Sequence, residues 1–192
     1  MSDDPFPIFE SWYEEAGSDA SPSRDAVALA TAAADARPSV RMVYYRGLRE
    51  GGFSFFTNYE SRKGRELAEN PFAAMVFYWA HIGRQVRIEG RVERLSAGES
   101  DKYFAGRSFR SQISAVVSNQ SRPIEDEDAF LQDLDNAEIV HANQRVARPE
   151  FWGGFRLIPT RFEFWTRGEH RRHRRIVYQD HDGEWRKSRL YP

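Results

Sequence analysis

The chain has 192 residues, enough for one substantial hydrophobic core, and its 40% apolar and 30% charged residues are ordinary for a globular protein. Its formal net charge of −1 excludes a globally basic nucleic-acid binder, and the lack of cysteine excludes disulfides and thiolate chemistry. The beginning MSDDPFPIFE does not resemble a signal peptide, and no apolar run reaches transmembrane length. We therefore expect a cytoplasmic protein, with residues 1–192 forming one domain. Aromatic residues, at 14%, leave some side chains free to line a site for a flat, conjugated ligand.

The first part of the chain predicts a helix followed by strands. Phe6, Phe9 and Tyr13 fall at helical spacing, and Gly17 is a suitable end for a helix within residues 1–17. A turn at Glu50-Gly51-Gly52 separates two strands with alternating or apolar character. The strands expected here cover residues 26–31, 39–46 and 53–57.

A short helix is then expected at about 59–69, capped by Thr57 or Asn58 and closed by Pro71. Two strands should follow, at 72–79 and 84–94. Ser96-Ala-Gly-Glu99 fits a capping box and should start the next helix.

Two further helical stretches are expected up to about residue 145, the second opening at Pro123 with an acidic first turn. From Trp152 onward, over residues 150–192, the chain again predicts strands, ending in a hairpin turned at Asp182-Gly183. About six or seven strands, mostly neighbours in sequence, indicate an α+β protein built on an antiparallel barrel. The absence of βαβ alternation and of a glycine-rich phosphate loop argues against a Rossmann-type nicotinamide site.

Four groups of residues are candidates for chemistry. Ser61-Arg62-Lys63 places two cations at a helix start, where a bound phosphate would be favoured, although a solvated surface turn has the same pattern. Arg41 and Arg46 lie five residues apart on one expected strand and should therefore point to opposite faces. Either of them alone fits a plain solvent-facing arginine.

The third group is a stripe of hydrogen-bond donors. Tyr103, Arg107 and Ser111 recur every four residues and would share one face if a single helix continues through them. Such a stripe suits an oxyanion, and a merely exposed face would have the same spacing.

The fourth group is the arginine-rich stretch 167–175. In strand geometry Arg171, His173 and Arg175 would share one face, while Arg172 and Arg174 would face the other way. A nucleic-acid patch is an alternative interpretation, disfavoured by the position of this segment between strands. Metal binding by His170 and His173 lacks a third ligand at suitable spacing, so no metal is expected.

Taken together, these segments resemble the pyridoxamine 5′-phosphate oxidase family along nearly the whole chain. The resemblance lies in motifs that occur in the family's order: RMVYYR, FFTNYESRKGRELAENP, RQVRIEGRVERLS, KYFAGRSFRSQIS, SNQS, FWGGFR and EFWTRGEHRRHRR. It implies a split β-barrel with peripheral helices, assembled as a homodimer that binds flavin mononucleotide (FMN) in clefts between its subunits.

By this resemblance, one set of residues would bind FMN and another the phosphorylated substrate. The implied FMN-binding residues are Arg41, Met42, Val43, Tyr44, Tyr45, Arg46, Phe56, Thr57, Arg62, Lys63, Gln85, Gln120, Ser121, Trp165 and Arg175. The implied substrate-binding residues are Arg46, Tyr103, Arg107, Ser111, Arg171 and His173, of which Arg171 and His173 would lie over the pyridine ring as the catalytic pair.

The implied reaction oxidises pyridoxamine or pyridoxine 5′-phosphate to the aldehyde, with dioxygen as acceptor and hydrogen peroxide as product. The chain departs from the family pattern at Arg46, where lysine is common, and at Arg172 and Arg174, where leucine and an acid are usual. Two alternatives are left open. The first is an FMN-dependent oxidase of another substrate, like the phenazine-biosynthesis relatives, and the second is a non-catalytic carrier of flavin or pyridoxal phosphate.

Overall fold

The structure, a computed structural model, describes residues 4–17 and 24–192. Its helices are α1 (Phe6–Ala16), α2 (Arg62–Glu69), α3 (Ala97–Ala105), α4 (Phe109–Val117) and α5 (Glu127–His141), with a 3-10 turn η1 (Glu169–Arg171). Its strands are β1 (Ala26–Ala32), β2 (Pro38–Tyr44), β3 (Leu48–Arg49), β4 (Gly52–Asn58), β5 (Phe72–Trp79), β6 (Arg84–Arg94), β7 (Trp152–Thr166), β8 (Arg174–His181) and β9 (Glu184–Leu190).

The strands form one nine-stranded sheet in the order β2-β1-β5-β6-β7-β4-β3, with β8 added to β7 and β9 to β8. All the strand pairs are antiparallel. The predicted α+β class and antiparallel sheet are confirmed. The described residues form nine strands where six or seven were expected, and one of the additional strands, the two-residue β3, carries no sequence pattern of its own. Within the described residues, no helix is both long and apolar enough to cross a membrane.

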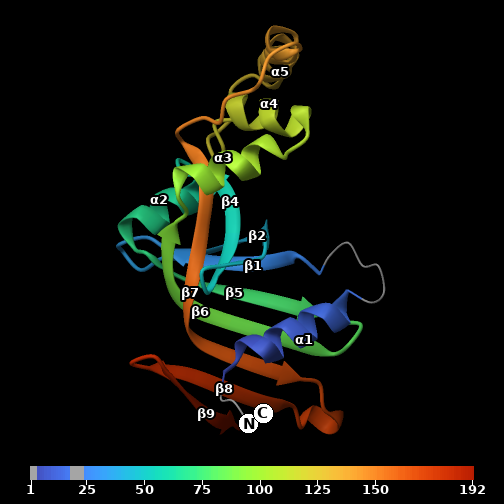
Figure 1. Cartoon of the computed structure of the whole chain (residues 1–192), viewed down its shortest axis with the longest axis vertical. Coiled ribbons are helices and arrows are strands. Elements are labelled where there is room, and N and C mark those ends of the chain that lie inside the picture. The colour runs from blue at the N-terminus through green and yellow to red at the C-terminus, as the bar shows by residue number, and fades with distance from the viewer. Residues whose placement is uncertain (1–3, 18–23) are drawn as a thin grey trace.

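Strand β7 is the longest element of the sheet and runs through most of the molecule (Figure 1). It pairs with β6 along its length, with β4 through its first half and with β8 through its second. The register with β6 shifts between Glu89 and Gly90, opposite Pro159, which has no N–H for the ladder. A Cβ on Gly90 would stand 1.9 Å from the carbonyl oxygen of Ile158, so the bulge needs glycine there.

The main core is aromatic and is closed by α1, which lies against the sheet (Figure 1). Phe9 is 1% exposed, and its ring meets those of Phe53 and Phe77 edge to face at 4.8 and 5.0 Å. The sequence expectation for this helix is confirmed, since α1 ends at Ala16 with Gly17 as its cap. The helical spacing of its aromatic residues reflects one buried face.

Two predicted helix starts are wrong by a few residues. Helix α2 is capped by Ser61, whose side chain accepts the N–H of Gly64, rather than by Thr57 or Asn58. Asn58 instead accepts the N–H of Glu60 in the preceding turn.

Helix α5 begins at Glu127 with Asp126 as its cap, so Pro123 and the first acidic residue precede the helix. The capping box at Ser96 and the Asp182-Gly183 hairpin turn between β8 and β9 are confirmed.

Substituting the bulge glycine should destabilise the fold. We expect Gly90→Ala to lower the free energy of unfolding by about 1–3 kcal/mol, because the added methyl group meets backbone that cannot yield cheaply. Gly98→Ala is the matched control: nothing lies within 4 Å of its Cβ position in α3, and alanine favours helix. Urea unfolding at one fixed protein concentration compares the two, and equal stabilities would contradict the close approach.

Candidate active site

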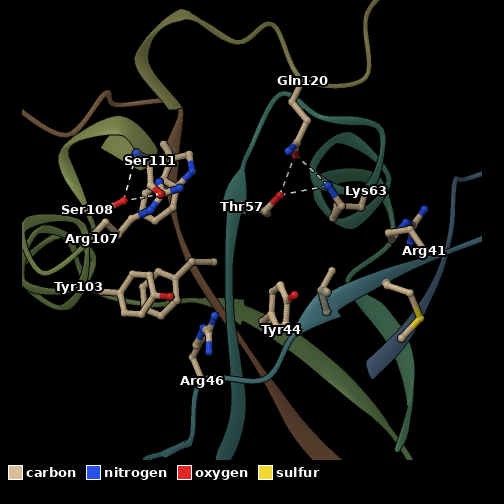
Figure 2. Close-up of a pocket in the computed structure, with 14 residues that line it drawn as sticks. Arg41, Tyr44, Arg46, Thr57, Lys63, Tyr103, Arg107, Ser108, Ser111 and Gln120 are labelled. Carbon is tan, nitrogen blue, oxygen red and sulfur yellow. Dashed lines mark hydrogen bonds between the residues drawn. The ribbon is translucent and has the colours of Figure 1, made fainter. Parts of the chain in front are cut away.

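A candidate site is a cavity of about 510 Å³ between β2, β4, α2 and the α3–α4 corner (Figure 2). Basic side chains lie toward its two ends, and apolar and aromatic side chains lie between them. Its lining residues are Arg41, Met42, Val43, Tyr44, Arg46, Phe56, Thr57, Lys63, Tyr103, Arg107, Ser108, Ser111, Gln120 and Trp152.

The first basic end is built on the start of α2. The Lys63 ammonium group donates to Thr57 Oγ1 at 3.0 Å, Ser61 Oγ at 3.1 Å and Gln120 Oε1 at 2.9 Å. Burial, and next the charge of Arg41, lower the pKa of Lys63 to about 8 even though Glu66 acts to raise it. A lysine held this way is a compact donor group at the wall of the cavity.

Behind this end lies a buried carboxylate, Glu66, which is 6% exposed. It pairs with Arg62 at 2.8 Å and with Arg41 at 3.2 Å. Burial alone would raise the pKa of Glu66, but hydrogen bonds from Ser39, Thr31 and Arg62 and the charge of Arg41 hold it at about 2. The two cations predicted at the helix start are therefore unlike: Lys63 lines the cavity, and Arg62 lies outside the lining set, bonded to Glu66.

The second basic end is formed by Arg107 with Tyr103, Ser108 and Ser111. The predicted continuous helical face is wrong, because α3 ends at Ala105 and α4 begins at Phe109, with Ser108 as its cap. The corner at Gly106 nonetheless brings all of these residues to the cavity (Figure 2). The Ser108 hydroxyl donates to that of Ser111 at 2.8 Å.

Arg107 has an unmet hydrogen-bonding capacity at this end. Its guanidinium carbon lies 4.6 Å from the centre of the Trp152 ring, and its Nη1 atom is buried without a hydrogen-bond partner among the described residues. Burial lowers the pKa of Arg107 from its ordinary value. A buried donor that lacks a partner is costly, and an anionic ligand would supply that partner.

The middle of the cavity carries flat and apolar surface. Phe56 and Tyr103 stack at 3.6 Å between ring centres, and Met42 and Tyr44 of β2 are 62% and 58% exposed. The prediction that Arg41 and Arg46 point to opposite faces is wrong, because both side chains line this cavity. Strand β2 ends at Tyr44, so alternation no longer holds at Arg46, which pairs with Asp25 at 3.5 Å.

A second cluster contains four other residues of the predicted site, and Arg171 precedes one of them, His173, by two positions in the chain. Gln85, Trp165 and Arg175 are direct partners across β6, β7 and β8 and so form a row on one face of the sheet. The His173 ring lies 4.6 Å from that of Trp165, and His173 Nδ1 accepts the N–H of Gly168 at 3.2 Å.

The predicted strand geometry for 171–175 is wrong at its start. Arg171 belongs to η1 and has a positive φ of 64°, and β8 begins only at Arg174. The backbone leaves the sheet because His170 and Arg171 adopt left-handed conformations, which are uncommon for residues other than glycine. This second cluster lies at the β8 side of the molecule, away from α3 and α4 (Figure 1).

Two other predicted residues lie apart from both groups. Tyr45 is 5% exposed in the aromatic core, and Ser121 lies in the exposed loop before α5. Conversely, Ser108 and Trp152 line the cavity although sequence reasoning gave them no role. The sequence features that could have indicated them are a helix-capping serine for Ser108 and the FWGGFR motif for Trp152. Among the described residues no group of three or more His, Asp and Glu is arranged to hold a metal ion.

Comparisons with known proteins point to one family. The family model described as pyridoxamine 5′-phosphate oxidase matches residues 14–141, and that described as the pyridoxine 5′-phosphate oxidase C-terminal dimerisation region matches residues 152–192. The pyridoxine/pyridoxamine 5′-phosphate oxidases of Gluconobacter oxydans and Coxiella burnetii are 44% and 49% identical over 189 residues, which cover 98% of this chain and 94% and 96% of theirs.

Two solved structures share the fold. PhzG from Burkholderia lata 383, in complex with tetrahydrophenazine-1-carboxylic acid, superimposes with a TM-score of 0.94 at 32% identity, covering 99% of this chain and 93% of that chain. A pyridoxamine 5′-phosphate oxidase-related, FMN-binding protein from Nostoc punctiforme has a TM-score of 0.80 at 19% identity, with both chains covered fully. At that identity the second likeness shows the fold alone.

The buried lysine should leave a signature in the pH dependence of stability. Because the pKa of Lys63 is about 8 in the fold and 10.5 for an ordinary lysine, the unfolded state binds more protons between these values. The stability of the protein without bound ligand should therefore rise through this range by up to roughly 3 kcal/mol more than that of Lys63→Met. Lys102→Met, at an exposed site on α3, should follow the unmodified protein. Parallel curves for all three in denaturant titrations would refute the assignment.

Proposed function

The chain belongs to the pyridoxamine 5′-phosphate oxidase family, and from this premise we propose that it is an FMN-dependent oxidase of pyridoxamine or pyridoxine 5′-phosphate. The product would be pyridoxal 5′-phosphate, with dioxygen as electron acceptor and hydrogen peroxide as the second product. The observation that carries the proposal is a cavity with two separate basic ends, one around Lys63 and one around Arg107, joined by flat and apolar surface. Two phosphorylated ligands that meet in the middle require such a cavity.

The residues at the first end fit the phosphate of FMN. Lys63 and Arg41 bring positive charge to the wall, and the start of α2 adds its free N–H groups. The Gln120 amide oxygen accepts hydrogen bonds from both Thr57 and Lys63. These two donors could bind a phosphate oxygen in the same way. Residues 42–44 and Phe56 offer the apolar surface that suits a flat ring system.

The second basic end would then hold the phosphate of the substrate. The feature that favours an anion there is Arg107 Nη1, which is buried and has no hydrogen-bond partner in the described part of the chain. The hydroxyl groups of Tyr103, Ser108 and Ser111 add further donors. Binding energy from this phosphate would serve to align the reacting carbon of the substrate. FMN, when held by the first end, would supply the redox chemistry, namely acceptance of a hydride and reoxidation by dioxygen.

A homodimer is part of the proposal, and the match to a C-terminal dimerisation region supports it. Trp152 lines the cavity, whereas Trp165 belongs to the second cluster at the far end of the same strand. At about 3.3 Å per residue, β7 separates these two positions by up to roughly 40 Å. One bound flavin cannot span that distance, so we propose that each site combines the cavity of one protomer with the second cluster of its partner.

Within that cluster, Arg171 and His173 are our proposed catalytic pair. Because His173 Nδ1 accepts the Gly168 N–H, Nε2 is the ring nitrogen left to donate. The ring therefore offers a donor at Nε2, which suits it to orienting the substrate by a hydrogen bond. Arg171, held by an uncommon backbone conformation, would bring its charge to the same ring of the substrate.

A second candidate function is oxidation of a tricyclic phenazine precursor by the same fold and cofactor. The observation that favours it is the TM-score of 0.94 to PhzG, whose crystal structure contains tetrahydrophenazine-1-carboxylic acid. Such a substrate has a carboxylate but no phosphate, so the donor set around Arg107 fits it less fully. The vitamin B6 phosphates are therefore the first choice.

The proposal predicts a yellow protein with one FMN per subunit, released on denaturation. Given pyridoxamine or pyridoxine 5′-phosphate and air, it should form the aldehyde and hydrogen peroxide in equal amounts. Absorbance scans and coupled peroxide detection measure both. Protein that takes up no FMN would overturn the proposal, and protein that binds FMN but oxidises neither phosphate would favour the second candidate.

The two ends of the cavity should separate in mutant kinetics. Lys63→Met should lower the affinity for FMN, whereas Arg107→Met should retain FMN and raise KM for the phosphorylated substrate about 10- to 100-fold. Arg110→Met is the matched control, since Arg110 is exposed and pairs with Glu138 of α5. Steady-state kinetics and flavin content decide, and loss of FMN from Arg107→Met with normal retention in Lys63→Met would reverse the two assignments.

A further inference from the structure

Glu66 joins three elements behind the first basic end of the cavity. From α2, its Oε2 atom accepts hydrogen bonds from Thr31 of β1 at 2.5 Å and from Ser39 and Arg41 of β2 at 2.6 and 3.2 Å. Its Oε1 atom accepts from Arg62 Nε at 2.8 Å. With 6% exposure, the carboxylate is nearly sealed from water, so these donors are its solvation.

The same contacts immobilise Arg41. Its Nη1 donates to the Leu29 carbonyl at 3.0 Å and to Thr31 Oγ1 at 2.6 Å, and its Nη2 donates to Ser39 Oγ and to Glu66. These bonds use the four terminal N–H groups, so the guanidinium group cannot swing away from the cavity wall. Arg62 is 61% exposed and is tied to Glu66 through its Nε atom.

We propose that Glu66 is a positioning residue that fixes Arg41 and Arg62 for the phosphate of FMN and so makes the site prefer FMN to riboflavin. The inference rests on the proposed function and adds a residue that touches neither cofactor nor substrate. Glu66 is absent from the lining of the cavity, as is Arg62, so its effect passes through Arg41, which lines the cavity, and through the charge of Arg62 beside the helix start.

A carboxylate is required because donors surround it on every side. In Glu66→Gln one oxygen becomes an NH2 group, which would face Arg62 Nε or the donors around Arg41. At least one guanidinium group must then turn away from Glu66→Gln. Binding of the phosphate would have to order that group again, and this entropy cost lowers the affinity. Charge alone would act in the opposite direction, since removing an anion favours phosphate. Water and salt weaken the gain in phosphate attraction at Arg62, because this side chain is exposed. The clash between buried donors is not screened, so we expect it to outweigh that gain.

The test compares two flavins that differ only in the phosphate. The flavin-free dimer of the full chain is titrated with FMN and with riboflavin, following flavin fluorescence. Glu66→Gln should lose about tenfold or more in FMN affinity and keep riboflavin affinity within about twofold. Glu69→Gln, an exposed glutamate in the same helix, should leave both affinities unchanged.

Other results would overturn the inference. Unchanged or tighter FMN binding in Glu66→Gln would show that charge outweighs positioning, and equal weakening of both flavins would show a purely structural role. If Glu66→Gln does not fold, Ser39→Ala answers the question. It removes one hydrogen bond to Glu66 and one from Arg41, and a smaller loss confined to FMN is expected. An unmodified protein that binds neither flavin would instead refute the proposed function.

Discussion

The site depends on the continuity of β7. This strand is hydrogen-bonded on both sides, to β6 along its length and to β4 and then β8, so its two ends are held at a fixed separation. Trp152 at its start belongs to the cavity, and Trp165 near its end belongs to the second cluster. A strand paired on both edges cannot fold back to bring these ends together. A site that uses both groups, as proposed above, therefore requires a second copy of the chain, in agreement with the match to a C-terminal dimerisation region.

Charge is balanced locally around the cavity. Glu66 offsets Arg41 and Arg62, and Asp25 offsets Arg46, whereas Lys63 has only neutral hydrogen-bond acceptors and Arg107 lies against an aromatic ring. Among the cavity-lining cations, the two without an ion pair to any described residue are therefore at opposite ends. Each end can gain by binding an anion, because a buried cation is most costly where no anion compensates it. This separation is what two distinct anion sites require, and one diffuse basic patch would not show it.

Much of the fold and part of the site could be predicted from sequence. Alternation and turn residues located most strands and the first helix, because side-chain burial has a period that sequence retains. The predictions failed where a local hydrogen bond decided the outcome. Ser61 and Asp126 cap the helices α2 and α5 in place of the residues predicted. A break at Gly106 divides the stripe from Tyr103 to Ser111 between two helices. The left-handed backbone at positions 170 and 171 places Arg171 outside the strand. Tyr103, Arg107 and Ser111 nevertheless line one cavity, because the corner between α3 and α4 brings the two helices together there.

The departures from the family pattern are accommodated by particular contacts. Arg46 stands where lysine is common. Its guanidinium carbon lies 4.8 Å from the centre of the Tyr44 ring, and its Nη1 atom pairs with Asp25. These two contacts hold the planar group beside the cavity. The arginine at 174, where an acid is usual, does not deprive Arg175 of an anion, because Arg175 Nε donates to the buried Glu163 at 2.7 Å. Glu163, at 2% exposure, also pairs with Arg87 at 3.3 Å, so its charge is neutralised within the sheet. The departure at 174 therefore changes the exposed side of β8 and leaves the row of Gln85, Trp165 and Arg175 intact.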